Sequence, residues 1–153
     1  MTSALRVAVL LPTVFQHAGE FFADVTALEA AGADAVLVEG SAPASFVLLG
    51  GVAAVTHSVK VGCLTREVPP AAAFNALDRI SGGRAIVIKP GRPPEAWTQI
   101  EPPADRAAWK AALAAQEAAG AAGIVVPWDP RLIDLLRNPG ADDDRSDLMM
   151  STG

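Results

Sequence analysis

The feature that most constrains the fold of this chain is the stretch Leu77–Gly91, LDRISGGRAIVIKPG, where a helix runs into a strand almost without a connecting loop. Gly82 and Gly83 can adopt the positive φ angles that end a helix. Arg84 then precedes the apolar run from Ala85 to Ile88, which is typical of a buried strand. A chain made of such units forms a parallel sheet, and its binding sites lie where strands end and the next loops begin.

Apolar strand patterns alternate with amphipathic helix patterns along most of the chain, and the phrases AAGADAVLVEG and AAGAAGIVVPWD repeat one helix-turn-strand unit. Successive parallel strands are joined by right-handed crossovers. The pattern therefore predicts an α/β fold, a partial (β/α) TIM-barrel-like parallel sheet with about five βα units. The expected strands are 5–11, 35–38, 59–64, 85–88 and 124–126, and the expected helices are 17–31, 43–56, 69–80, 105–119 and 131–137.

The length of 153 residues, 51% of them hydrophobic, predicts a single domain over residues 1–140. We expect residues 141–153 to form an acidic, disordered tail. Five prolines between Pro90 and Pro103 interrupt any regular element there, which predicts an ordered loop or a linker. The N-terminal apolar run is short and broken by Pro12, so we interpret it as the first strand and not as a signal peptide.

The charge and cysteine content exclude several classes of protein. A net charge of -5 without clustered Lys and Arg argues against nucleic acid or an anionic membrane as the main partner. No apolar run approaches the roughly 18 residues of a membrane span. The single cysteine, Cys63, excludes an intrachain disulfide, and we interpret it as an inert buried thiol. The spacing of Cys and His predicts no metal site, and we expect a cytoplasmic protein.

Three successive phrases, LEAAGADAVLVEG, VAAVTHSVKVGCLT and PPAAAFNALDRISGGR, resemble the luciferase-like monooxygenases in order and spacing. The resemblance covers roughly Leu5 to Gly91, and AAQEAAGAAGIVVP is similar to a late helix-strand unit of the same family. It implies a (β/α) barrel that uses reduced flavin, such as FMN, or a deazaflavin cofactor to oxidise a small molecule. A complete barrel needs about 250 residues, so this chain would be a shortened member.

The resemblance and the predicted topology together single out residues at the ends of the strands. Glu39 follows the second strand, where the family places an acidic residue, and it would act as general base or bind substrate. The alternative is that Glu39 caps the next helix or pairs with Arg66 or Lys89. His17 follows the first strand and is a second catalytic candidate, as a proton carrier.

Five further residues are the candidates for cofactor binding at the same edge of the sheet, and two of them are cationic. Arg66 and Lys89 suit a phosphate or carboxylate, although solvated or structurally paired charges are an alternative interpretation. The last predicted helix begins with Asp129 and Pro130, which place a negative charge at the anion position and remove one N–H donor. That helix is expected to be a poor phosphate site. The cofactor candidates are Thr13, Ser41, Thr65, Arg66 and Lys89.

A partial barrel leaves sheet edges and helix faces uncovered, which predicts a homodimer or larger assembly. Trp97 and Trp109 are candidates for covering an edge or forming that interface, and core packing explains them equally well. Asp78, Arg79 and Arg84 surround the double-glycine turn, so we expect a charge pair to hold it.

The resemblance favours two functions over a third, an unrelated small α/β enzyme that uses the strand-end carboxylate without flavin. The first is a luciferase-like flavin- or deazaflavin-dependent oxidoreductase or monooxygenase of reduced size, acting on an unknown small molecule. The second is a non-catalytic descendant of the family that serves as a small-ligand-binding or oligomeric assembly protein.

Overall fold

The computed structural model describes residues 5–91 and 96–138, in which strands and helices alternate. The strands are β1 (Arg6–Leu10), β2 (Ala35–Glu39), β3 (Lys60–Leu64), β4 (Ala85–Ile88), β5 (Trp97–Gln99) and β6 (Gly123–Pro127). The helices are α1 (Ala18–Ala31), α2 (Pro43–Val55), α3 (Ala71–Ile80), α4 (Arg106–Ala118) and α5 (Arg131–Arg137). The predicted acidic tail lies outside the described residues.

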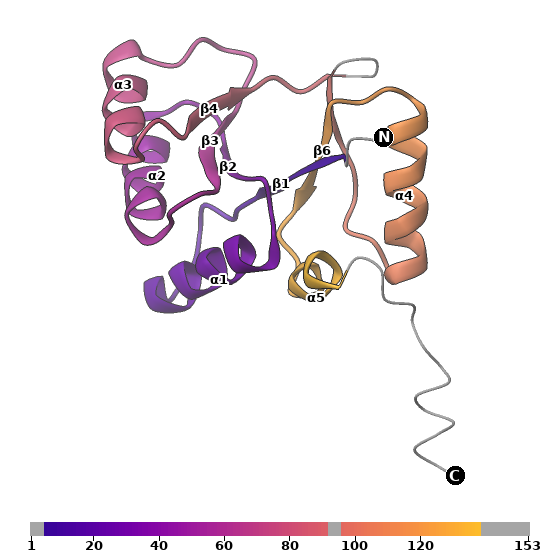
Figure 1. Cartoon of the computed structure of the whole chain (residues 1–153). Helices are drawn as coiled ribbons and strands as arrows, with labels where there is room; N and C mark the ends of the chain where they lie inside the picture. Colours follow the sequence, from indigo (N-terminus) through magenta and orange to yellow (C-terminus); the bar gives the residue numbers. More distant parts are fainter. Residues whose placement is uncertain (1–4, 92–95, 139–153) are drawn as a thin grey trace.

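All six strands pair in parallel and form one curled sheet of order β4-β3-β2-β1-β6-β5 (Figure 1). The first strand is therefore central, and later strands add to both of its sides. This architecture confirms the predicted α/β fold with a partial, TIM-barrel-like sheet. The segment after β4 meets the start of β5 at a parallel bridge between Pro90 and Trp97, so the two outer strands are joined at one point.

The strand β5 corrects the expectation that the proline-rich segment contains no regular element. Trp97 pairs with Gly123 and Gln99 with Val125, which makes Trp97–Gln99 a sixth strand at the edge of the sheet. A strand of three residues is too short to show an alternating pattern, and the flanking prolines suit an edge position. The predicted strand count of about five was one too low for this reason.

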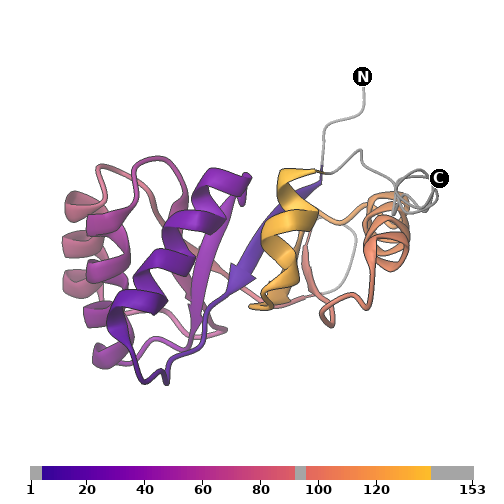
Figure 2. The same ribbon diagram turned by 90° about the horizontal axis from the view of Figure 1, so that it is seen from below.

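The five described helices lie along one face of the sheet. Helices α3, α2, α1 and α5 follow one another in a row, and α4 lies beyond α5 near β6 (Figure 2). Helix α1, predicted over 17–31, ends at Gly32, which has a left-handed φ of 103°. Large apolar side chains from strands and helices meet between the layers, among them Val9, Val25, Leu28, Leu49, Val61, Trp109, Ile124 and Leu132.

The concave face of the sheet is filled by strand side chains and carries no helix. Leu37, Leu64 and Ile88 are each at most 3% exposed there, and Ile86 and Trp97 pack against them. Small residues make room for these side chains: a Cβ on Gly62 would lie 1.7 Å from the carbonyl oxygen of Ile86. Among the described residues, buried apolar side chains therefore occupy the interior of the curled sheet.

The two tryptophans singled out in the sequence have different places. Trp109 of α4 is 2% exposed in the helix-covered core. Trp97 is half-buried, and its ring lies across Gly123, where an added Cβ would come within 2.6 Å of ring carbons. Core packing thus accounts for Trp109, whereas Trp97 belongs to the edge strand and the concave face.

Arg84 holds the double-glycine junction by binding backbone carbonyls. Its guanidinium donates to the carbonyl oxygens of Ala53 (3.1 Å), Thr56 (3.1 Å), Val59 (2.8 Å) and Ser81 (2.6 Å), and to the hydroxyl of Thr56 (2.9 Å). The side chain therefore satisfies carbonyls at the C-terminal end of α2, where a helix leaves them without partners. It joins α2, the start of β3 and the end of α3.

The predicted charge pair at this junction is wrong. Asp78 accepts a hydrogen bond from the backbone N–H of Ala85 at 3.3 Å. Within the part of the chain that the structure describes, no ion pair links Asp78 to Arg79 or Arg84. Carbonyl oxygens take the place of the expected carboxylate because α2 ends beside Arg84, a contact between elements that are distant in sequence.

Glu29 connects α1 to the turn before β3 through hydrogen bonds. Its carboxylate accepts backbone N–H groups from His57 (2.7 Å), Ser58 (2.7 Å) and Val59 (3.0 Å). Burial raises the pKa of Glu29, but these hydrogen bonds and His57 outweigh it, so that its pKa lies below the ordinary value.

No helix in the described ranges is both long and apolar enough to cross a membrane.

Candidate functional site

A cleft of about 500 Å³ opens where strands β2, β3 and β4 end. We call it the strand-end cleft, and it is lined by Glu39, Gly40, Leu64, Thr65, Arg66, Glu67, Pro90 and Gln99. This is the end of a parallel sheet at which ligands usually bind. Three of the predicted site residues, Glu39, Thr65 and Arg66, lie together in it.

Backbone hydrogen bonds between neighbouring strand ends position the lining of the cleft. The N–H of Gly40 donates to Leu64 at 3.0 Å, and the N–H of Thr65 donates to Ile88 at 3.0 Å. Gly40 has a φ of 85°, which lets the chain turn immediately after Glu39. These bonds hold the chain after β2 and the chain after β3 side by side, so that Glu39 and Arg66 open into one cleft.

Three charged side chains line the strand-end cleft, two acidic and one basic. Glu39, Arg66 and Glu67 are exposed, and none of their side chains forms a hydrogen bond or ion pair with another described residue. The alternative roles for Glu39 are therefore not seen: α2 has no side-chain cap, and neither Arg66 nor Lys89 pairs with Glu39. The cleft offers two carboxylates and one guanidinium to a ligand.

Thr65 has a different character from its charged neighbours. It is 8% exposed, and its hydroxyl oxygen accepts the backbone N–H of Glu67 at 3.1 Å. This short turn orients Arg66 and Glu67 at the rim of the cleft. Thr65 is thus a positioning residue for the rim.

The remaining predicted site residues do not line the strand-end cleft. Thr13 and His17 are exposed in and after the loop that follows β1, and His17 is the residue before α1 without a side-chain capping bond. Ser41 is half-buried before α2, and Lys89 is exposed after β4. All four lie near strand ends, as predicted, but the cleft does not bring them into contact with Glu39.

Sequence reasoning missed Gln99 and Pro90 as lining residues. Both depend on β5, the strand that the prolines concealed, because Gln99 is its last residue and Pro90 bridges to its first. The signal that could have found them was the apolar and aromatic pair Ala96 and Trp97 between two proline clusters. Two residues are too few for a periodicity argument.

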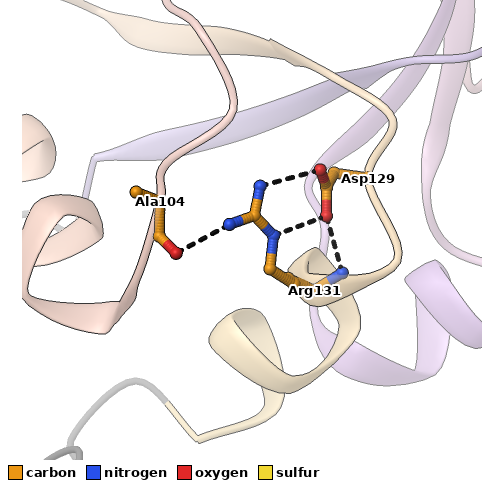
Figure 3. Close-up of polar contacts among 3 residues, drawn as sticks. All are labelled: Ala104, Asp129 and Arg131. Atoms are coloured by element: carbon orange, nitrogen blue, oxygen red, sulfur yellow. Dashed lines mark hydrogen bonds and ion pairs between the residues drawn. The ribbon is translucent and has the colours of Figure 1, made fainter.

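The N-terminus of α5 is occupied by the chain's own carboxylate (Figure 3). Asp129 accepts the backbone N–H of Arg131 at 2.9 Å, and its two oxygens also accept the guanidinium of Arg131 at 2.9 and 3.0 Å. Arg131 donates in addition to the carbonyl oxygen of Ala104 at 2.7 Å. The Arg131 side chain holds the pKa of Asp129 below its ordinary value, so the carboxylate stays ionised at this position.

Cys63 is buried, as predicted, and burial raises the pKa of its thiol, which disfavours the reactive thiolate. Over residues 5–91 and 96–138, no group of three or more His, Cys, Asp or Glu side chains is placed to hold a metal ion.

Comparison with known proteins gives no independent identification. No family model matches the chain, and no curated protein matches it significantly.

Proposed function

We propose that this chain is a small-ligand-binding protein of luciferase-like ancestry that holds its ligand in the strand-end cleft. The observation that supports the proposal best is the convergence of Glu39, Arg66 and Glu67 on one cleft, each without a partner among the described residues. Charged groups that lack internal partners at the functional end of a parallel sheet are suited to binding a ligand.

The charges of the cleft define the class of ligand. Two carboxylates favour a cationic or donor-rich group, and the guanidinium of Arg66 favours a carboxylate or carbonyl oxygen. A small zwitterion, such as a compound with one amino group and one carboxylate, matches both. The volume of about 500 Å³ lies in the range of small-molecule sites.

The described residues fit the flavin cofactors poorly. FMN and the deazaflavins carry a phosphate, which needs cations or free N–H groups. Carboxylates outnumber the single guanidinium in the strand-end cleft, and Asp129 occupies the N-terminus of α5. The concave face of the sheet is filled by Leu37, Leu64 and Ile88 and offers a flat ring no open surface at these residues. These residues therefore do not support flavin chemistry at this site.

A reduced-size flavin- or deazaflavin-dependent oxidoreductase is the second candidate. It is favoured by the position of Glu39 and Arg66, because the resemblance implies a carboxylate and a cofactor-binding group at these strand ends. In that case Glu39 would be the general base, and His17, which lies outside the cleft, would need to approach through the loop that follows β1.

Titration with FMN, reduced FMN and a deazaflavin, followed by absorbance and calorimetry, separates the two candidates. We expect no binding of any flavin, and binding of small zwitterions that Glu39→Gln and Arg66→Gln weaken. Arg79→Gln is the matched control, because Arg79 is exposed on α3 and does not line the cleft. Stoichiometric flavin binding that Arg66→Gln abolishes would instead favour the oxidoreductase.

A further inference from the structure

A second cavity lies at the opposite end of the sheet, where the strands begin. Its volume is about 430 Å³, and we call it the strand-start pocket. It is lined by Arg6, Ala33, Asp34, Ala35, Ser58, Val59, Lys60, Ile86 and Trp97. It shares no lining residue with the strand-end cleft, and the buried side chains of the concave face lie between the two.

Two cations project into this pocket from the first residues of β1 and β3. Ala8 and Leu10 of β1 and Leu64 of β3 belong to the concave face. Because side chains alternate along a strand, Arg6 and Lys60 lie on the same face. Neither side chain has a hydrogen bond or ion pair with another residue of the described ranges. The pocket thus contains two positive charges without an ion-pair partner among the described residues, in a protein whose net charge is -5.

The acidic residue of the pocket is already engaged. Asp34 accepts the backbone N–H of Val7 at 2.8 Å through Oδ2, and its own N–H donates to the carbonyl of Val7 at 2.9 Å. The nearby Glu29 does not line the pocket and is taken up by the amides of residues 57–59. The lining therefore carries an excess of one positive charge.

An aromatic surface stands beside the two cations. Trp97 lies across Gly123, which has no side chain to displace the ring, and Ile86 faces it from the other outer strand. Trp97 is half-buried, so part of the indole remains open to the pocket. An indole and an isoleucine offer stacking and apolar contact to a flat ring, and Arg and Lys offer hydrogen bonds to an anion.

We propose that the strand-start pocket binds a planar aromatic anion, a ring that carries a phosphate or carboxylate group. The ring packs against Trp97 and Ile86, and the anionic group lies between Arg6 and Lys60. This is a second binding site, separate in position and opposite in charge from the strand-end cleft, and it does not depend on the proposed function of that cleft.

Phenyl phosphate and benzoate are the probes, with inorganic phosphate as a probe without a ring. Binding to the full chain is measured by calorimetry and by backbone amide shifts. The expected result is that both aromatic probes bind more tightly than inorganic phosphate, perturb the amides of Trp97 and Lys60, and bind more weakly as salt is raised. No binding of either aromatic probe, or tighter binding of inorganic phosphate, overturns the proposal.

Variants test the assigned residues, with circular dichroism to establish that each is folded. Arg6→Gln and Lys60→Gln should each weaken phenyl phosphate binding about tenfold, because each removes a charge-assisted contact. Asp34→Asn keeps the acceptor for Val7 and removes a negative charge, so it should tighten binding about two- to fivefold. Arg79→Gln, which changes an exposed cation on α3 that lines neither cavity, should leave it unchanged. A loss with Arg79→Gln, or affinity unaffected by Arg6→Gln and Lys60→Gln, refutes the pocket.

Discussion

Replacing Arg84 tests the structural role of the junction between α3 and β4. Its guanidinium makes five hydrogen bonds to the end of α2, the start of β3 and the end of α3. A hydrogen bond to a charged group contributes about 1.5–3 kcal/mol, but bonds from one side chain are not additive. Arg84→Ala also leaves carbonyls such as that of Ala53 without a partner. We therefore expect a loss of about 3–4 kcal/mol in the free energy of unfolding.

The conservative variant Arg84→Lys should lose about 2 kcal/mol, because a single ammonium cannot reach partners on both α2 and α3. The measurement is urea unfolding followed by circular dichroism and tryptophan fluorescence. Arg79→Ala is the matched control, since Arg79 is exposed three residues before the turn and is expected to change stability by less than about 0.5 kcal/mol. If Arg84→Ala is as stable as Arg79→Ala, the carbonyl contacts do not hold the junction.

Three further predictions concern single residues. Amide hydrogen bonds lower the pKa of Glu29 in the folded state, so the stabilisation it provides is present above the unfolded pKa and is lost as pH falls through the folded pKa. Glu29→Gln should therefore flatten the fall in the free energy of unfolding between about pH 5 and pH 3. An unchanged slope would contradict this. Gly62→Ala should lower the free energy of unfolding by at least roughly 3 kcal/mol, because the new Cβ overlaps the carbonyl of Ile86. Gly50→Ala, whose Cβ meets open space within α2, should raise it by about 0.5–1 kcal/mol in the same urea experiment. Equal effects of the two variants would refute this packing. Arg131→Ala should raise the carboxyl pKa of Asp129 towards its ordinary value in an NMR titration, and an unmoved pKa would show that another group lowers it.

The sequence predicted the order of the elements because each carries a local signal. The caps are examples: Gly32 ends α1 in the left-handed region, Pro43 begins α2, and Asp105 accepts the N–H of Ala108 at 2.7 Å at the start of α4. Each depends on residues that are neighbours in sequence. The two adjacent glycines of α2 differ in their packing: a Cβ added to Gly51 would lie 2.9 Å from the ring of Phe22, whereas one added to Gly50 would meet no atom within 4 Å.

Contacts between distant segments escaped prediction. Nothing near Arg84 in sequence indicates that it binds the end of α2. In the same way, nothing near Glu29 indicates that it accepts three amides of the turn before β3. In the candidate site, too, a residue brought in by a distant segment was not predicted. Strand ends identified Glu39, Thr65 and Arg66, but Gln99 enters the cleft through β5, a strand too short to recognise. The strand-start pocket was missed because it forms only when β1, β3 and β5 curl together.

The central claim is that the strand-end cleft binds a small polar ligand through Glu39 and Arg66. The most direct test is an NMR screen of zwitterionic small molecules and flavins against the uniformly ¹⁵N-labelled chain. We expect zwitterionic hits that shift the amides of Gly40, Thr65 and Gln99, and that are lost in Glu39→Gln and Arg66→Gln. Hits that map elsewhere, or a flavin that binds in the cleft while zwitterions do not, would contradict it.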